Sequence, residues 1–337
     1  MAITAKLARL APKPETNHML YGPTHRAIQN ALSQLIEKEI NPNVDQWERN
    51  KLFPAKTVFK KFGNLGIFGV NKPTEYGGLG LDFSYSVAVA ETMGQVNCGA
   101  IPMAAEVQSD MATPALAEYG SDYLKREFLM PSLTGEVVSC LGVSEPHAGS
   151  DVAAIRTYAR KHNDDLIITD TAEIFFDNVR VPMRNIIGDE GRGFFYQMSQ
   201  FQHERLVAVA VLLEPLSKII DTTMEYARER QIFGQPELNN QIVSYQLAEM
   251  RVELESVRSL LYRAVLEKLS GEDVTILASM AKFKAARIAR SITDNCLQAS
   301  LNGHIVSRFY RDLRLFSIAG GCDEVMLSII SRHFESK

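Results

Sequence analysis

The sequence predicts a mainly α-helical protein with a small β-domain between two helical regions. Apolar residues recur at helical spacing before Gly135, short β-rich runs follow from Glu136, and long amphipathic segments resume after Gly193. We therefore expect an N-terminal helical domain over residues 1–135, a middle β-domain over 136–192 and a C-terminal four-helix bundle over 193–337.

The N-terminal elements follow from apolar spacing and from breaker residues. Helical patterns run from about Thr24 to Lys61, with Pro42 and Pro54 between them. The segment KPTEYGGLGLD then reads as a loop, because one proline and three glycines fall within eight residues. No β-branched strand precedes this glycine cluster and no GxGxxG spacing is present, so a dinucleotide site is not expected.

Three further helical segments complete the N-terminal domain. They are SYSVAVAETMGQ, AAEVQSDMATPALAEYG and SDYLKREFLMPSLTG. Gly94 and Gly120 are stop signals, and Ser121 is the expected N-cap of the third segment.

The middle and C-terminal regions differ in the length of their elements. The runs VVSCLGVS, IRTYARK, DLIITD and AEIFFDNVRVP predict short strands, and IIGDEGRG predicts a tight turn. Beyond Gly193 four helical segments follow, separated by breaks that include Gly234, Pro236 and Gly271. Short breaks between long amphipathic helices indicate an antiparallel bundle.

Composition limits the classes of partner. The chain has 337 residues, 46% of them hydrophobic, which is enough for a substantial core. Its 36 basic and 40 acidic residues are spread without long blocks, so neither nucleic acid nor an anionic membrane is an expected partner. No apolar run reaches the roughly 20 residues that span a bilayer. We expect small molecules or further copies of the chain as partners.

The cysteines do not form a metal or disulfide pattern. Cys98, Cys140, Cys296 and Cys322 lie far apart, without CxxC spacing and without histidines at ligand spacing. We therefore expect no metal site and a reducing compartment.

The first thirteen residues, MAITAKLARLAPK, contain Lys6, Arg9 and Lys13 and no acidic residue. This is the composition of a weak mitochondrial presequence, which predicts a mitochondrial matrix location. The alternative is a loose N-terminal arm on a cytoplasmic protein.

The string GVSEPHAGSDVAA, residues 142–154, is the most specific in the sequence. Gly149 allows close approach of the backbone to a ligand, and Ser144 and Ser150 offer hydroxyl groups. The exposed amides of such a turn suit phosphate or flavin oxygens. The string resembles the signature of the acyl-CoA dehydrogenase family. That resemblance implies flavin contacts at Leu141, Val143, Ser144, Gly149 and Ser150, with Ser150 also facing acyl-CoA.

Glu204 is the candidate catalytic base. Removing the weakly acidic α-proton of an acyl thioester requires a carboxylate in a water-poor pocket, and the apolar run LVAVAVLL follows closely. The ERL context resembles isovaleryl- and long-chain acyl-CoA dehydrogenases, which take the base from this helix. Gly320 occupies the position of the base in the medium-chain type. The alternative is a solvated glutamate in an i,i+4 pair.

Two further segments carry the resemblance. In RERQIFGQPELNNQ, the family pattern places Arg230, Phe233 and Gln241 on the flavin diphosphate and adenine across a subunit boundary. Alone, Arg230 would be an ordinary charge at a helix C-terminus.

The closing segment YRDLRLFSIAGGCDEV implies a flexible turn beside the flavin. By resemblance, Gly321, Cys322 and the earlier Gln298 contact the cofactor, while Arg205 and Gly320 contact the substrate. Cys322 stands where threonine is usual, and a thiol is a weaker hydrogen-bond donor.

The chain departs from the family inside the β-domain. The resemblance runs from about Thr24 to Phe334, but the segment before AEIFFDNVRVP that carries a Trp-x-Thr-Asn flavin wall is absent near Asp170. Trp47, the single tryptophan, is too early to replace it. A second gap follows Gln298. A barrel that lacks strands exposes unpaired edges, so we expect a truncated, less stable β-domain.

The resemblance implies FAD-dependent α,β-dehydrogenation of acyl-CoA thioesters, reoxidation by an electron-transfer flavoprotein, and a homo-oligomer, usually a tetramer. The alternative function is a catalytically silent member of the fold that binds acyl-CoA or partner helices. An acyl-CoA oxidase is a third option, disfavoured because those chains are longer. The sequence leaves acyl length and branching open.

Overall fold

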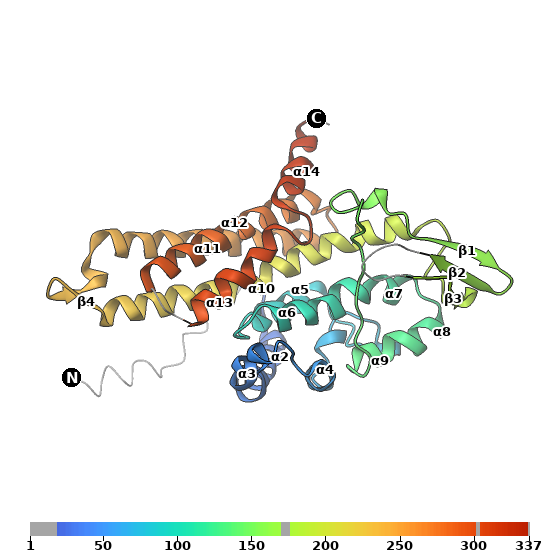
Figure 1. The fold of residues 1–337 in the computed structure, drawn as a ribbon, viewed down its shortest axis with the longest axis horizontal. Helices are drawn as coiled ribbons and strands as arrows, with labels where there is room; N and C mark the ends of the chain where they lie inside the picture. The colour runs from blue at the N-terminus through green and yellow to red at the C-terminus, as the bar shows by residue number, and fades with distance from the viewer. Residues whose placement is uncertain (1–18, 170–175, 301–303, 336–337) are drawn as a thin grey trace.

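The computed structural model describes residues 19–169, 176–300 and 304–335. Its longest helices run along one axis, and a small sheet lies at one end of that axis (Figure 1). This mainly helical architecture with a small β part confirms the predicted fold class. The predicted presequence, residues 1–13, and the junction at Asp170 lie outside the described residues.

The N-terminal third is helical, as the apolar spacing predicts. Its α-helices are α2 (Pro23–Leu35), α3 (Val44–Arg49), α4 (Ala55–Asn64), α5 (Phe83–Met93), α6 (Ala100–Glu106), α7 (Pro114–Tyr119), α8 (Asp122–Leu124) and α9 (Met130–Leu133). Short 3-10 or π-helical turns join them: η1 (Ile36–Ile40), η2 (Asn41–Asn43), η3 (Ile67–Gly69), η4 (Thr74–Tyr76), η5 (Val107–Ala112) and η6 (Lys125–Leu129).

Local signals set several of these boundaries. The hydroxyl of Ser121 accepts a hydrogen bond from the amide of Leu124 at 3.3 Å, which confirms Ser121 as the N-cap of α8. Gly94 and Gly120 directly follow α5 and α7, so both predicted stop signals are confirmed. Local chemistry therefore places these helix ends without help from distant packing.

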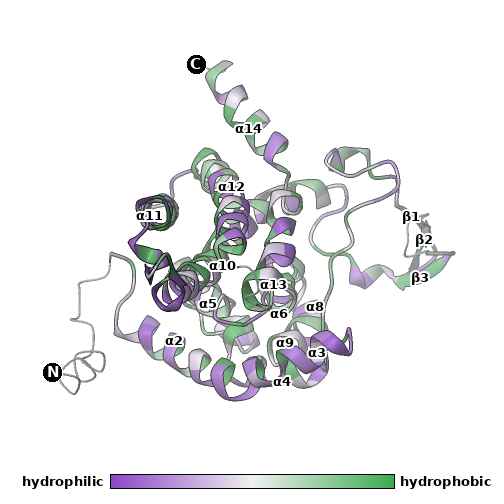
Figure 2. Cartoon of the chain, turned by 60° about the vertical axis from the view of Figure 1, so that its left-hand side comes forward, coloured by the Kyte–Doolittle hydropathy of each residue, from purple (hydrophilic) through white to green (hydrophobic). Residues whose placement is uncertain are grey.

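The core forms where α5 packs between α2 and the long helix α10 (Gly193–Glu229). Tyr85 is the one residue of α5 that is not buried, and the run Leu206–Leu213 of α10 is buried throughout. Helical segments that are buried on every side have to be enclosed by others, and in Figure 2 α5 and α10 lie in the middle of the helical body. No helix in the described ranges is both long and apolar enough to span a bilayer.

The middle region contributes a small antiparallel sheet. Its strands, in spatial order, are β1 (Tyr158–His162), β2 (Asp165–Thr169) and β3 (Val179–Pro182). Every residue of β1 is exposed, and the sheet stands apart from the helices at the end of the molecule (Figures 1 and 2). The short turns η7 (Val152–Ala154) and η8 (Met183–Asn185) flank it. The sheet is therefore an outlying element with little core of its own.

One predicted strand is wrong. Residues 136–144, which contain VVSCLGVS, form no strand, and the nearest pairing is a single bridge between Glu145 and Ala148. A strand needs a neighbour to satisfy its backbone groups, and the described part of this region supplies none for it. The segment instead pairs with a side chain: Gln108 donates to the carbonyl of Val137 and accepts from the amide of Ser139, and Val137 and Val138 are exposed.

The C-terminal region is built on α10, α11 (Gln241–Leu269) and α12 (Thr275–Ser300). A hairpin of β4 (Gln231–Ile232) and β5 (Gln235–Pro236), followed by the turn η9 (Glu237–Asn239), connects α10 to α11. The fourth predicted helix is divided into α13 (His304–Asp312), the turn η10 (Leu313–Ser317) and α14 (Asp323–Glu335), which projects from the body (Figure 1). The three pieces pack along α12.

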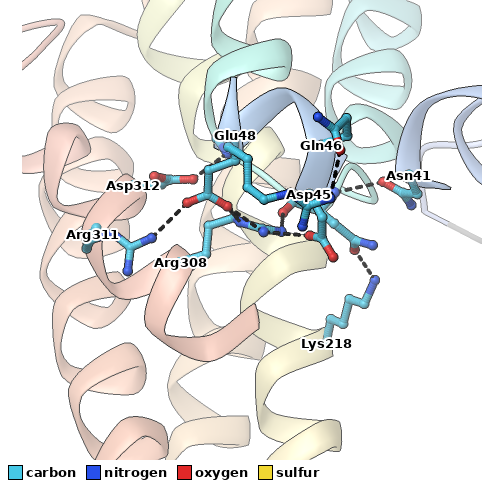
Figure 3. Close-up of polar contacts among 11 residues, drawn as sticks. Asn41, Asp45, Gln46, Glu48, Lys218, Arg308, Arg311 and Asp312 are labelled. Atoms are coloured by element: carbon cyan, nitrogen blue, oxygen red, sulfur yellow. Dashed lines mark hydrogen bonds and ion pairs between the residues drawn. The ribbon is translucent and has the colours of Figure 1, made fainter. Parts of the chain in front are cut away.

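Hydrogen bonds and ion pairs of charged side chains connect the C-terminal region to the N-terminal domain. Arg308 of α13 is 3% exposed and donates hydrogen bonds to Asp45 at 2.7 Å, to Glu48 at 2.5 Å and to the carbonyl of Asn97 at 2.9 Å. Figure 3 shows Arg308 between the two carboxylates, with Arg311 on the other oxygen of Glu48. Contacts between positions about 260 residues apart thus close the fold.

Candidate active site

Glu204 lies in the first third of α10 and is 7% exposed. The helix continues directly into its buried run, so the carboxyl group faces a water-poor environment. Burial raises the pKa of Glu204 above the usual range for a glutamate. The alternative of a solvated helical glutamate is therefore wrong for this side chain.

The closing turn lies directly against this carboxyl group. A Cβ atom added to Gly320 would lie 3.0 Å from Oε1 of Glu204. Gly320 and Gly321 have φ of +66° and +94°, which a glycine adopts without strain. Two left-handed residues in succession fold the chain back sharply between η10 and α14. The structure thus brings together two of the predicted site residues, Glu204 and Gly320.

Two cations oppose the effect of burial on Glu204. Arg205 and Lys282 lower the pKa of the carboxyl group, whereas Asp110 raises it further. Arg205 is half-buried, and its Nε has no hydrogen-bond partner among the described residues. An N–H that lacks a partner in an enclosed site can serve a ligand.

Sequence reasoning missed Lys282. This side chain is 2% exposed, and its ammonium group donates a hydrogen bond to the carbonyl of Gly321. Burial lowers the pKa of Lys282 to about 8, although Asp323 acts in the opposite direction. The available signal was its position: Lys282 falls at helical spacing with the buried residues Ala278 and Ala285.

The signature turn meets the closing turn. The hydroxyl of Ser150 lies 3.9 Å from Sγ of Cys322, across 172 positions of sequence. Leu141 and Val143 are half-buried, while Ser144, Gly149 and Ser150 are exposed. The structure therefore gathers Ser150 and Cys322 at the end of α10 that carries Glu204.

Glu145 fixes the shape of the signature turn. Its carboxylate accepts hydrogen bonds from the amides of Arg156 at 2.7 Å and Thr157 at 2.9 Å. Hydrogen bonds from Thr157 and Arg156 lower the pKa of Glu145 to about 2. His147 lies 3.0 Å from the same carboxylate, so it has a local partner in the turn.

The turns leave room for a flat ring. A Cβ atom added to Gly142 or Gly149 would meet no atom within 4 Å, so the backbone there faces open space. Ser144 and Ser150 are exposed on the same turn, and the hydroxyl of Ser150 lies 3.9 Å from Sγ of Cys322. These residues fit the ring end of a flavin.

The other predicted cofactor residues lie elsewhere. Arg230, Phe233 and Gln241 surround the β4–β5 hairpin, at the opposite end of the molecule from the small sheet (Figure 1). Arg230 is 26 positions after Glu204, which corresponds to about 39 Å along a helix. Phe233 is fully exposed with φ +49°. One chain alone does not bring these residues to its own Glu204.

Gln298 is also separate from the closing turn. It is exposed and lies 16 positions after Lys282 on α12, about 24 Å along the helix. Within one chain Gln298 does not join Gly321 and Cys322.

A narrow cavity lies between η3, α5, α6, η5 and α10. Apolar side chains that include Val89, Met93 and Val207 line it together with Glu106 and Asp110. Glu106 is 3% exposed, and neither carboxyl oxygen has a partner among the described residues. Burial, then Asp110 and Glu204, raise the pKa of Glu106 well above its usual range.

A wider hollow adjoins this cavity at Asp110. It is lined by residues that include Lys72, Gln200 and His203. Burial lowers the pKa of His203 to about 4. In the described ranges, His, Cys, Asp and Glu side chains form no cluster that could hold a metal ion.

Comparisons with known proteins match both helical regions of the chain to one family. Residues 22–136 match the acyl-CoA dehydrogenase N-terminal domain, and residues 191–334 match the acyl-CoA dehydrogenase C-terminal domain. The chain is 26% identical to the mitochondrial short-chain specific acyl-CoA dehydrogenase of Rattus norvegicus over 372 aligned positions, covering 92% of this chain and 90% of the relative. It is 24% identical to the mitochondrial long-chain specific enzyme of Sus scrofa over 378 positions, covering 93% and 87%.

The fold is similar to the crystal structure of a probable acyl-CoA dehydrogenase from Mycobacterium abscessus. The TM-score is 0.88 at 27% identity, covering 94% of this chain and all of that chain. Both alignments with the mammalian relatives are longer than the 337 residues of this chain, so the relatives carry residues that it lacks. The chain belongs to the acyl-CoA dehydrogenase family.

Proposed function

We propose that this protein catalyses the FAD-dependent α,β-dehydrogenation of acyl-CoA thioesters. The observation that carries the proposal is the buried carboxyl group of Glu204, which lies against the Gly320 turn. The family resemblance allows the catalytic base at position 204 or at position 320. Position 320 is a glycine without a side chain, whereas position 204 carries a buried carboxyl group. This supports Glu204 as the base.

Glu204 takes the α-proton onto a carboxylate oxygen. A carboxylate with a raised pKa is a better match for a weakly acidic C–H group than an ordinary glutamate. Arg205 and Lys282 oppose the effect of burial and favour the ionised form of Glu204.

When bound, FAD would supply the acceptor for the β-hydride. Leu141, Val143, Ser144, Gly149 and Ser150 of the signature turn would hold its ring, together with Gly321 and Cys322. By the family resemblance, Ser150, which lies 3.9 Å from Sγ of Cys322, would also face the thioester. Because Cys322 offers a thiol rather than a hydroxyl, a hydrogen bond from it to the ring is weaker.

The hairpin residues support a homo-oligomeric enzyme. Arg230 lies about 39 Å along α10 from Glu204 of its own chain, and Phe233 and Gln241 belong to the same end of the molecule, so we infer that they serve the cofactor of another copy. A fully exposed Phe233 also favours burial in an interface. The family's usual assembly is a tetramer, and an electron-transfer flavoprotein is the proposed oxidant.

We also propose the mitochondrial matrix as the location. The basic first thirteen residues support it, and so do the mitochondrial names of the mammalian relatives. Imaging the full-length chain and a chain lacking these residues tests this. Mitochondrial signal that depends on the segment is expected, and uniform cytoplasmic signal of the full chain would contradict it.

The activity test uses the purified chain incubated with FAD. We expect bound flavin and reduction of an artificial electron acceptor with one of a set of short, long and branched acyl-CoA thioesters. The Glu204→Gln variant should bind flavin but lose turnover. Glu225→Gln is the matched control, because Glu225 is exposed on the same helix.

The catalytically silent alternative gives a different result. It predicts a protein that takes up no flavin and turns over no acyl-CoA in the set. Turnover that survives Glu204→Gln would contradict the assignment of the base while leaving the family membership intact.

A further inference from the structure

Lys282 occupies a position that lysine rarely takes. It is 2% exposed on α12, whereas lysines normally extend their ammonium group to water. Taking an ammonium group out of water is costly unless hydrogen bonds and opposite charges compensate for the lost hydration. The surroundings of Lys282 therefore indicate what keeps it in place.

The first compensation comes from the closing turn. The ammonium group donates a hydrogen bond to the carbonyl of Gly321. A Cβ atom added to the preceding Gly320 would lie 3.0 Å from Oε1 of Glu204 and 3.9 Å from Cε of Lys282. The turn is thus enclosed between the two side chains, with Glu204 on α10 and Lys282 on α12.

The second compensation comes from charge. Asp323 on the C-terminal side attracts Lys282, as Glu204 on α10 does, whereas Arg205 repels it. Oδ2 of Asp323 also accepts a hydrogen bond from Arg290 at 2.8 Å and lies 3.8 Å from Arg287.

Because Asp323 also interacts with Arg290 and Arg287, it neutralises the charge of Lys282 only in part, and Lys282 can still act on Glu204. From η5, Asp110 adds negative charge near Glu204. Lys282 is thus one of two cations, with Arg205, that offset burial at the carboxyl group.

We propose that Lys282 is a positioning residue for this reaction: it holds the Gly320–Gly321 turn against Glu204 and stabilises the carboxylate form of that side chain. Its effect on catalysis rests on the proposed function, but its effect on the Glu204 carboxyl group does not. The same contact also places Cys322 and Ser150 relative to the base, because Cys322 directly follows the anchored carbonyl.

Three substitutions separate charge from hydrogen bonding. Lys282→Arg keeps both the positive charge and a donor, Lys282→Gln keeps a donor without charge, and Lys282→Met removes both. Lys284→Met is the matched control, because Lys284 lies on the same helix in a partly exposed ion pair with Glu253 at 2.5 Å.

The first measurement needs neither cofactor nor substrate. Infrared difference spectroscopy, with Glu204→Gln to assign the band, follows protonation of the Glu204 carboxyl group against pH. We expect this titration to move to higher pH in Lys282→Gln and Lys282→Met, and to stay near the wild-type position in Lys282→Arg and Lys284→Met.

The second measurement uses the FAD-loaded enzyme. At the acidic end of its pH profile, kcat/KM should fall about tenfold or more in Lys282→Gln, because a nearby opposite charge typically shifts a pKa by one unit or more. Lys282→Arg should restore most of this loss. Above the acidic limb the difference should narrow, since Glu204 is then ionised in each variant.

An unchanged Glu204 titration in Lys282→Gln would overturn the inference, even if the variant were less stable. If Lys282→Met does not fold, the comparison of Lys282→Gln with Lys282→Arg decides the outcome. If the wild type shows no turnover, the proposed function fails, and the infrared titration still decides whether Lys282 stabilises the Glu204 carboxylate.

Discussion

The carboxyl group of Glu204 occupies the space that a side chain at position 320 would need, since a Cβ atom added to Gly320 would lie 3.0 Å from Oε1 of Glu204. This is closer than ordinary van der Waals contact between such atoms. A side chain at position 320 would therefore displace the Glu204 carboxyl group. The buried carboxyl group of Glu204 therefore requires a residue without a side chain at position 320.

Gly320→Ala should disturb this arrangement. The substitution adds the close contact with Glu204 and also strains a backbone with φ +66°, at a cost of about 1–2 kcal/mol. Gly271→Ala is the control, because Gly271 has φ +87° but open space around its added Cβ. Both variants should lose stability in urea denaturation, and only Gly320→Ala should also lose kcat/KM. Equal kcat/KM values of the two variants would contradict the claim that a side chain at position 320 displaces the Glu204 carboxyl group.

The activity should depend on pH through Glu204. Burial raises the pKa of this carboxyl group, and only the ionised form can accept the α-proton. As pH falls through the raised pKa, kcat/KM should therefore decline, beginning above the usual titration range of a glutamate. The measurement is kcat/KM against pH for the FAD-loaded enzyme. A profile that stays flat down to the ordinary glutamate range would show that Glu204 is not the titrating base.

Glu106 should make the fold less stable as pH rises. Because burial raises its pKa in the folded chain, the unfolded chain releases this proton first, near the ordinary glutamate value. The stability that protonated Glu106 contributes is thus fully present at pH values below the pKa of the unfolded chain. It declines as pH rises toward the folded pKa, by at most about 1.4 kcal/mol per pH unit.

Glu106→Gln removes this proton but keeps the size of the side chain. Its free energy of unfolding, relative to wild type, should therefore increase between acidic and neutral pH in urea titrations. Glu225→Gln, at an exposed position of α10, provides the comparison for a surface carboxyl group. The same difference at both pH values would refute the assignment of a buried, protonated Glu106.

The contacts of Arg308 should contribute measurably to stability. Arg308→Met removes hydrogen bonds to two carboxylates, Asp45 and Glu48 (Figure 3). Both carboxylates remain partly exposed, so we expect a loss of about 2 kcal/mol rather than the full cost of breaking an enclosed ion pair. Arg126→Met, which breaks the exposed pair with Asp122, should cost less than about 1 kcal/mol. Similar losses of unfolding free energy in Arg308→Met and Arg126→Met would show that the burial of Arg308 does not strengthen its ion pairs.

The helical part of the fold follows closely from the sequence. Apolar spacing and the signals at Gly94, Gly120 and Ser121 act within a few residues, so they need no knowledge of distant partners. The expected strand over VVSCLGVS fails for the opposite reason. A strand depends on a neighbour elsewhere in the chain, and β propensity cannot supply one.

The candidate site was predictable where motif residues carry it. Glu204, Gly320, Ser150 and Cys322 meet in the structure although they come from three distant segments. The side chains around them were not foreseen, because their burial depends on how α5, η5, α10 and α12 pack. Lys282 and Glu106 look like ordinary surface charges until that packing encloses them.

Exchange of the substrate α-proton tests the central claim most directly, because it reports proton removal without requiring complete turnover. The FAD-loaded protein is incubated with an acyl-CoA in deuterated buffer, and deuterium at the α-carbon is measured by mass spectrometry. Wild type and Glu225→Gln should incorporate deuterium at similar rates, and Glu204→Gln should be slower by about a hundredfold or more. Incorporation by Glu204→Gln at the wild-type rate would contradict the assignment of Glu204 as the base.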